Sequence, residues 1–349
     1  MLKPQRLKKG DTVALVSMSA NNIGEEKYAF RFKLIEERLK SLGLNYIFSA
    51  NALKSREELT QNPNLIFEDI IESFKNKDVK AIIAINGGHN AETTLKFFLE
   101  NEEVKNIVLS NPKIVLGYSD TTIQHLVFYR WGLQTYYGQN LVCDICEQEE
   151  TMLPYSKKHF EMLFSSKLET IEKSDIWYHE RQTYGESQNG IPRQREQNTD
   201  YEFIGFNEDI EGELLGGCIE RLNLLLTSTD KTINSVFPTI NEWKNKILFL
   251  ESCEESQTPQ QIAEMLENFE KNGIFNAVKG VIWGRRANNV YVKEMKEIFT
   301  KISNKYKLPV VFNANVGHAS PRSILPYGAL VKLNNTDNKI YILESFAGD

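Results

Sequence analysis

Short apolar runs that alternate with amphipathic segments restrict the fold of this chain more than any other feature. Residues 12–17 (TVALVS), 79–86 (VKAIIAIN) and 113–116 (KIVL) have the length and composition of buried strands. Helical spacing of apolar residues recurs in the segments that intervene or follow, which are 25–42, 65–76, 91–100 and 120–131. This alternation predicts an α/β fold with a parallel sheet covered on both faces.

The second half of the chain repeats the alternation. Strands are expected at 212–215, 246–250, 278–283 and 309–312, helices at 218–226, 259–272 and 292–304, and a closing hairpin at 329–333 and 339–343. Residues 179–199 differ, because they are polar, rich in Gln, Arg, Asn and Gly, and without periodicity. We interpret this stretch as a long loop or a connection between domains, and loops of that length are usually functional or disordered.

Composition narrows the function classes. The 349 residues are long enough for two domains or one large one, and 41% are hydrophobic and 25% charged, as in ordinary globular proteins. A net charge of −6 argues against nonspecific binding of nucleic acid, which needs a basic face. No apolar run approaches the ~20 residues of a membrane helix, and no apolar region follows the basic N-terminus. We therefore expect a cytoplasmic protein that binds neither nucleic acid nor a membrane.

The four cysteines do not suggest a disulfide framework or a metal centre. Cys143 and Cys146 form a single C-x-x-C pair without a second pair or a nearby histidine, and Cys218 and Cys253 stand alone. Structural zinc sites need four ligands at characteristic spacings. We expect reduced thiols and no metal.

The chemically most informative stretch is 113–122, KIVLGYSDTT. Ser119 follows an apolar run that stops at Gly117 and precedes a helical segment. Such a strand–turn–helix exposes a serine hydroxyl at the carboxyl end of a strand, where functional groups of parallel sheets collect. The G-x-S-x-G elbow of α/β-hydrolases is incomplete here, because Thr121 replaces its second glycine. We predict that Ser119 is the nucleophile of a hydrolase.

A serine nucleophile needs a general base and a carboxylate that orients the base. His318 follows an expected strand and Gly317, in a loop stiffened by Pro321, where a base is expected. Glu251 ends the apolar run ILFLE, where a carboxylate is costly unless it is paired or functional. A glutamate that simply reaches water at the end of a strand is the alternative.

The remaining histidines fit the role of base less well. His125 lies on the helix after Ser119 and should point away from it, His159 lies in a charged helical patch and is expected at the surface, and His179 lies in the polar stretch. His89 follows Gly87-Gly88 and could line a site. The backbone N–H groups of Gly88 and Asp120 are candidates for an oxyanion hole, because both follow strand ends; an ordinary tight turn is the alternative for the two glycines.

Six motifs occur in order along nearly the whole chain: 85–88 (INGG), 117–120 (GYSD), 212–217 (GELLGG), 248–251 (LFLE), Gly284-Arg285, and Gly317-His318 with Pro321. Together they resemble the LD-carboxypeptidase family of serine peptidases, which includes the microcin C immunity proteins. The resemblance implies a Ser-Glu-His triad at Ser119, Glu251 and His318, oxyanion donors at Gly88 and Asp120, no cofactor, and commonly a homodimer.

Two branches of that family imply different substrates. One removes terminal D-alanine from murein tetrapeptides, and the other cleaves the amide that joins a peptide or amino acid to a modified adenylate. The run 250–255 (LESCEE) and the extended 170–200 segment look more like the second, microcin immunity branch. That branch stacks a loop tryptophan on the nucleobase, and Tyr184 occupies the position here; Asn86 and His89 differ from both branches. Either Arg285 or Arg286 could bind a substrate carboxylate or phosphate, or be a surface cation.

The combined expectation is a two-domain enzyme with its active site at the interface. Residues 1–165 form a Rossmann-like, parallel-sheet domain with the nucleophile, 166–205 a connecting segment and substrate loop, and 206–349 an α/β domain with a mixed sheet that carries Glu251 and His318. Tyr184, His89 and Arg285 are the expected substrate-binding residues. A noncatalytic ligand-binding protein on the same scaffold is the alternative from another class.

Overall fold

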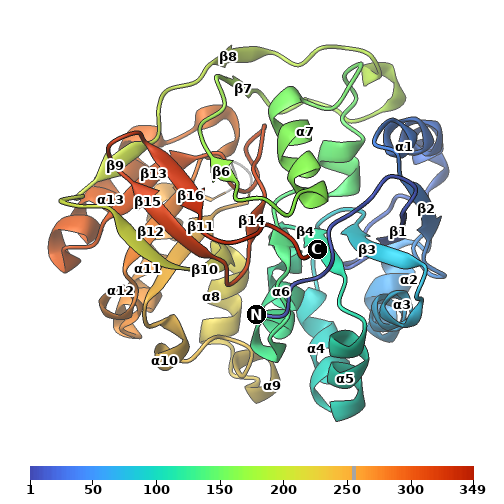
Figure 1. The fold of residues 1–349 in the computed structure, drawn as a ribbon, viewed down its shortest axis with the longest axis horizontal. Helices are drawn as coiled ribbons and strands as arrows, with labels where there is room; N and C mark the ends of the chain where they lie inside the picture. The colour runs from blue at the N-terminus through green and yellow to red at the C-terminus, as the bar shows by residue number, and fades with distance from the viewer. Residues whose placement is uncertain (254–256) are drawn as a thin grey trace. The chain divides into compact units, whose positions relative to one another are not determined.

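The computed structural model describes residues 1–253 and 257–349, and the chain divides into two compact units, each with its own sheet and core (Figure 1). Unit 1 comprises Met1–Ser166, Arg181–Arg193 and Ala347–Asp349. Unit 2 comprises Lys167–Glu180 and Gln194–Phe346. The last two glutamates of the 250–255 run, which favoured the microcin immunity branch, lie outside the described residues.

Five strands of unit 1 lie in the order β5-β4-β3-β1-β2 and all pair in parallel. The apolar runs form its centre as β1 (Thr12–Val16), β3 (Val79–Ala84) and β4 (Ile114–Gly117), which are almost entirely buried. Because β1 pairs with both β2 (Asn45–Phe48) and β3, the direction of winding reverses between β1 and β3. Ligand sites of open parallel sheets lie at the carboxyl ends of strands beside such a reversal.

Helices cover the sheet of unit 1. Contacts join α1 to β2 and α3 to β1 and β3, and right-handed crossovers in the two winding directions place α1 and α3 on opposite faces. Local signals begin several helices: Ser55 and Glu58 form a capping box at α2, and Pro63 opens α3. The bounds are α1 Phe30–Ser41, α2 Arg56–Gln61, α3 Pro63–Lys75, α4 Leu95–Leu99, α5 Glu102–Ser110, α6 Thr122–Trp131, β5 Tyr136–Tyr137 and α7 Pro154–Glu161.

Unit 2 has a mixed sheet in the order β6-β16-β15-β10-β11-β12-β13-β9. The four strands β10 to β13 are parallel, whereas β9, β15, β16 and β6 pair antiparallel to their neighbours. Helix α11 contacts both α8 and α13, so these three crossover helices form one layer on the sheet. The strands of this sheet are β6 Thr170–Ile171, β9 Glu202–Ile204, β10 Ile210–Cys218, β11 Lys246–Glu251, β12 Gly280–Gly284, β13 Val310–Ala314, β15 Leu330–Asn334 and β16 Lys339–Ile342. The two-residue strand β14 (Leu325–Pro326) belongs to the residues of unit 2 but not to this sheet. The helices are α8 Ile219–Thr227, α9 Lys231–Asn234, α10 Ile240–Trp243, α11 Pro259–Lys271, α12 Ile274–Ala277 and α13 Val292–Tyr306.

The α/β fold class, with a parallel first sheet and a mixed second sheet, is confirmed, and two local expectations need correction. Gly216 and Gly217 lie inside β10 rather than after it; a Cβ on Gly216 would overlap the Phe249 carbonyl of β11. The polar stretch 179–199 is not wholly a loop, because β8 (Arg195–Gln197) pairs with β7 (Ile176–Tyr178) in a two-stranded ribbon. The three β8 residues are exposed, so no apolar alternation marks the strand.

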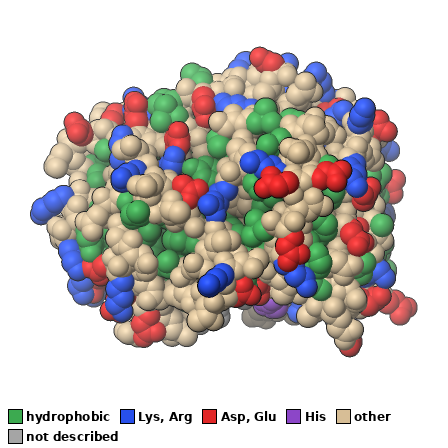
Figure 2. Space-filling view, turned by 90° about the horizontal axis from the view of Figure 1, so that it is seen from below, with side chains coloured by type: hydrophobic (Ala, Val, Ile, Leu, Met, Phe, Trp, Pro, Cys, Tyr) green, Lys and Arg blue, Asp and Glu red, His purple; other side chains and the backbone are tan. Residues whose placement is uncertain are grey.

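The described residues include no helix that is long and apolar enough to span a membrane. Over the face drawn in Figure 2, acidic and basic side chains of the described residues are interspersed rather than separated by sign. Nucleic-acid binding surfaces gather basic residues on one face or stripe, and this face lacks that arrangement among the residues drawn in colour.

Candidate active site

Ser119 lies at the turn that joins β4 to a 3₁₀ turn (Ser119–Thr121) and then to α6. The serine is half-buried and has a φ of +66°, a conformation that costs energy for a residue with a Cβ. Gly117 allows the sharp turn, because a Cβ there would lie 2.8 Å from Thr121 Oγ1. The Ser119 N–H donates to the Tyr137 hydroxyl at 3.1 Å. A strained strand-to-helix turn of this kind is typical of a displayed nucleophile.

The glycine turn after β3 lies against Ser119. A Cβ on Gly87 would lie 3.3 Å from Ser119 Oγ, and a Cβ on Gly88 would lie 2.6 Å from Ser19 Oγ. The Asp120 carboxylate accepts a hydrogen bond from the Ala91 N–H at 3.0 Å and lies 2.5 Å from Ser19 Oγ. Asp120 therefore ties together the turns after β1, β3 and β4.

Sequence reasoning missed Ser19, although its place two residues beyond Ser17 and the expected first strand was a usable signal. His89 belongs to the same turn and is exposed, and its carbonyl lies 2.8 Å from Ser19 Oγ. Unit 1 thus brings together Ser119, Asp120, Gly88 and His89 of the predicted site residues.

Tyr184 is held in unit 1 by a buried ionic network on the segment Arg181–Arg193. Arg181 and Arg193 both pair with Glu147, at 2.9 and 3.1 Å, and all three side chains are almost completely buried. The Tyr184 carbonyl accepts a hydrogen bond from Arg31 Nη2 at 3.1 Å, while the residue remains 38% exposed. An exposed aromatic ring is therefore presented by an anchored loop.

Glu251 and His318 meet in unit 2. Glu251 ends β11, and its Oε2 lies 2.6 Å from His318 Nδ1 and accepts the His318 backbone N–H at 3.2 Å. Glu251 is fully buried, whereas the His318 side chain is 12% exposed. When Nδ1 carries the proton that it donates to Glu251, the neutral ring leaves Nε2 as its basic nitrogen. The alternative that Glu251 simply reaches water is wrong.

Two glycines make room for the Glu251 side chain. Gly317 has a φ of +86°, and a Cβ there would overlap Glu251 Cγ and Oε2. A Cβ on Gly284, at the end of β12, would lie 2.9 Å from Glu251 Cβ. The Gly284-Arg285 and Gly317-His318 motifs thus surround one carboxylate.

The Glu251 charge governs the basicity of His318. Burial by itself lowers the pKa of His318, but the charge and the hydrogen bond of Glu251 outweigh it, so the pKa lies above its usual 6.5. The Arg322 charge lowers this pKa, and its Nη2 donates to the His318 carbonyl at 2.7 Å. The environment therefore favours the imidazolium, which a general base becomes after it accepts a proton.

Arg285 follows β12 at the same sheet edge as Glu251. The residue is 2% exposed. Its Nη1 donates to the Asn289 side-chain oxygen at 3.0 Å, and Nη2 donates to that of Asn198. The guanidinium also lies 5.9 Å from the Trp177 ring centre. Among the described residues it has no carboxylate partner, and burial lowers its pKa to about 10. Arg286 is also buried, so the alternative that either arginine is a surface cation is wrong.

The structure also places the remaining histidines. His125 is fully buried and bridges Thr135 Oγ1 and the Gly117 carbonyl, and burial lowers its pKa to about 3. His159 is not at the surface as expected, because it lies on the buried face of α7, with its ring centre 4.4 Å from that of Tyr155. The charged residues next to it in the sequence lie on the other face of the helix. His179 pairs with Glu196 at 2.7 Å.

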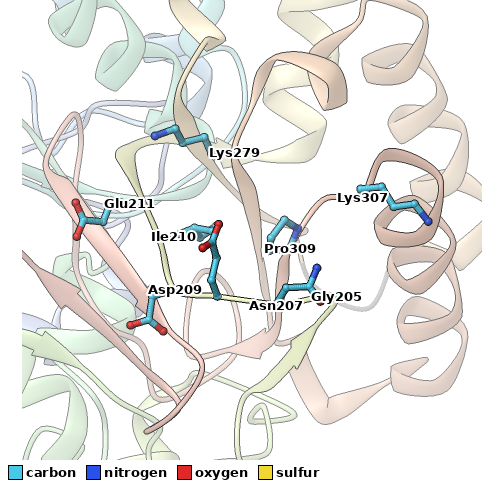
Figure 3. Close-up of a pocket in the computed structure, with 9 residues that line it drawn as sticks. Gly205, Asn207, Asp209, Ile210, Glu211, Lys279, Lys307 and Pro309 are labelled. Atoms are coloured by element: carbon cyan, nitrogen blue, oxygen red, sulfur yellow. The ribbon is translucent and has the colours of Figure 1, made fainter.

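A pocket of about 410 Å³ lies in unit 2 at the amino ends of β10, β12 and β13 (Figure 3). The parallel strands place it at the opposite sheet edge from Glu251, and none of the predicted site residues lines it. Its lining is Gly205, Asn207, Glu208, Asp209, Ile210, Glu211, Lys279, Lys307 and Pro309. Among the described residues, no three His, Cys, Asp or Glu side chains are grouped as metal ligands.

The chain is similar to known proteins over nearly its whole length. Sequence profiles of the LD-carboxypeptidase N-terminal and C-terminal domains match residues 13–138 and 211–333. The probable murein peptide carboxypeptidase of Bacillus subtilis is 27% identical, covering 98% of this chain and 94% of the relative. The microcin C7 self-immunity protein of Escherichia coli is 24% identical, covering 97% and 94%.

A solved structure extends the similarity to three dimensions. The MccF-like protein from Streptococcus pneumoniae, crystallised in complex with AMP, is 32% identical, with a TM-score of 0.89 and coverage of 95% of this chain and 98% of that one. Identity at this level over both domains exceeds what a shared fold alone requires. The chain therefore belongs to the LD-carboxypeptidase family.

Proposed function

We propose that the protein is a serine hydrolase that cleaves an amide bond in a small peptide-like substrate. Ser119 is the nucleophile, His318 the general base and Glu251 the group that orients the base. The buried hydrogen bond between Glu251 and His318 Nδ1, at 2.6 Å, carries the proposal. It supports the role because it holds one tautomer and stabilises positive charge on the ring.

In the proposed acylation step, Ser119 Oγ bonds to the scissile carbonyl carbon as its proton passes to His318 Nε2. The N–H groups of Gly88 and Asp120 donate to the oxyanion that forms. The intermediate collapses with cleavage of the C–N bond, and His318 returns the proton to the leaving amine. Water then attacks the acyl-enzyme by the same route, releasing the acid and restoring Ser119. Glu251 remains ionised throughout.

Replacement of the nucleophile tests this mechanism. We expect Ser119→Ala to lower kcat by about 10⁴-fold or more while the unfolding curve stays unchanged. Ser110→Ala, on the exposed end of α5, is the matched control and should keep full activity. A fully active Ser119→Ala protein would overturn the mechanism. Labelling of the wild type, but not of Ser119→Ala, by a fluorophosphonate would exclude a noncatalytic binding protein.

For the substrate, we propose a peptidyl or aminoacyl adenylate analogue of the microcin C type. The identity of 32% to a protein crystallised with AMP supports this choice, as does the exposed Tyr184 ring on its anchored loop, which offers a flat apolar face to a nucleobase. The murein tetrapeptide is the second candidate, supported by the 27% identity to the Bacillus subtilis relative. Hydrolysis assays with an aminoacyl sulfamoyl adenosine and with a murein tetrapeptide, run side by side, distinguish the two candidate substrates. Failure to cleave either compound would refute both substrate assignments.

Arg285 is proposed to bind an anionic group of the substrate, either a carboxylate or a phosphoryl-type group, and His89 to line the site beside the glycine turn. A buried cation with only amide partners among the described residues is costly unless an anion accompanies it. We expect Arg285→Gln to raise KM for the cleaved substrate about tenfold or more, with a smaller change in kcat. Arg195→Gln, on exposed β8, is the control. An unchanged KM would remove Arg285 from the binding role.

The family resemblance extends the proposal to a cytoplasmic homodimer. Sedimentation equilibrium of the purified chain measures its association directly. A mass near the 40.2 kDa of one chain at micromolar concentration would remove the dimer.

A further inference from the structure

A second buried acid lies beside the Glu251–His318 pair. Glu220 is the second residue of α8 and is 7% exposed. It follows the carboxyl end of β10, where Cys218 lies in register with Glu251 of β11. The topology therefore places Glu220 and Glu251 at the ends of adjacent parallel strands.

Hydrogen bonds hold the Glu220 carboxylate in place. Oε1 and Oε2 accept from the Cys253 backbone N–H at 3.1 and 3.3 Å, and Oε2 also lies 2.9 Å from Cys218 Sγ. The first turn of a helix favours a negative charge, because its N–H groups point toward it. Glu220 thus binds the chain just beyond Glu251 and has partners suited to its ionised form.

We propose that Glu220 is a positioning residue for the hydrolytic site: its carboxylate, which accepts the Cys253 N–H two residues beyond Glu251, holds the turn after Glu251 and acts on His318 through that end of β11. The catalytic role of Glu220 rests on the proposed function, whereas the contacts that support it all lie within unit 2. The charged groups that act on His318 include Glu251 from β11, Glu220 from α8, and Arg322 from the histidine's own loop.

The electrostatics support the same assignment. The charge of Glu220 raises the pKa of His318, in the same sense as Glu251, whereas Arg322 lowers it. Burial raises the pKa of Glu220 itself; the Cys218 bond lowers it, and the Glu251 charge raises it further. Glu220 is thus ionised above its own raised pKa and loses its effect on His318 below it.

The test is the pKa of His318, measured on the full chain by NMR of the histidine ring carbons. The His318 signal is assigned by its loss in His318→Asn. We expect Glu220→Gln, which keeps the shape and removes the charge, to lower the pKa of His318 by about half a unit or more. Glu267→Gln, which removes an exposed charge on α11, is the control and should leave it unchanged. An unchanged pKa in folded Glu220→Gln overturns the proposal.

A conservative variant separates charge from shape and covers a failure of Glu220→Gln to fold. Glu220→Asp keeps the charge with a shorter reach, so the pKa of His318 should stay nearer the wild-type value than in Glu220→Gln. A pKa as low as in the glutamine variant would mean a purely structural role and overturn the inference. In active enzyme, the acid limb of kcat/KM should move with the measured pKa. Absence of any hydrolysis refutes the proposed function, whereas the NMR result still decides the role of Glu220.

Discussion

Replacing Gly317 with alanine tests the packing around the Glu251–His318 pair. Two costs follow from the structure. At a φ of +86°, a residue with a Cβ loses about 1–2 kcal/mol relative to glycine. The added methyl also overlaps Glu251 Cγ and Oε2, and overpacking of a buried site costs about 1–3 kcal/mol. We expect Gly317→Ala to lose about 2–5 kcal/mol of unfolding free energy in unit 2, and kcat to fall because Glu251 is displaced.

Gly132→Ala isolates the backbone contribution. Gly132 has a φ of +94°, and beyond its two chain neighbours no heavy atom of the described residues lies within 4 Å of an added methyl, so only the conformational cost of about 1–2 kcal/mol applies. Urea unfolding followed by tryptophan fluorescence suits Gly317→Ala, because three of the four tryptophans, Trp177, Trp243 and Trp283, lie in unit 2. Circular dichroism measures the unfolding of the control and of Gly317→Ala alike. Equal losses in the two variants, or an unaltered kcat in Gly317→Ala, would refute the steric argument.

Three further predictions use other parts of the structure. Burial lowers the pKa of His125 to about 3, against 6.5 in the unfolded chain, so the unfolded state binds an extra proton below pH 6.5. The free energy of unfolding should therefore fall by up to about 1.4 kcal/mol per pH unit between pH 6 and 4. In urea titrations His125→Asn should show a flatter dependence on pH, and equal slopes in the two proteins would contradict the prediction. Glu147→Ala leaves two buried arginines without their carboxylate, so it should destabilise the Arg181–Arg193 segment by about 3–5 kcal/mol and speed its cleavage by trypsin. Glu196→Ala, which removes an exposed ion pair, is the control and should change stability by under about 1 kcal/mol. Similar cleavage rates in the two variants would contradict this prediction. Gly88→Ala places a methyl 2.6 Å from Ser19 Oγ and should lower kcat about 10²-fold or more by moving an oxyanion donor, and an unchanged kcat would exclude that role.

The fold class could be predicted from the sequence because the spacing of apolar residues indicates which face of each strand or helix is buried. The runs before Gly87 and Ser119 read as strands on their own, and the structure has them as β3 and β4. Local signals failed where burial depends on distant partners. His159 stands among charged residues in the sequence, yet it lies on the buried face of the amphipathic α7. For Arg285 and Arg286 the sequence left anion binding and a surface position open, and the structure shows both buried after β12.

The candidate site divides in the same way. Residue chemistry and ordered motifs were enough to nominate Ser119, Glu251 and His318, because a nucleophile, a base and a carboxylate at strand ends are recognisable types in the chain itself. Only the tertiary structure reveals that Gly317 makes room for Glu251, that Ser19 joins the turns of unit 1, and that Glu220 stands beside the Glu251–His318 pair. The reason is physical: the periodicity of a strand encodes that it is buried, but not which strand lies beside it. The neighbours of each side chain are therefore decided by the order and register of the sheet.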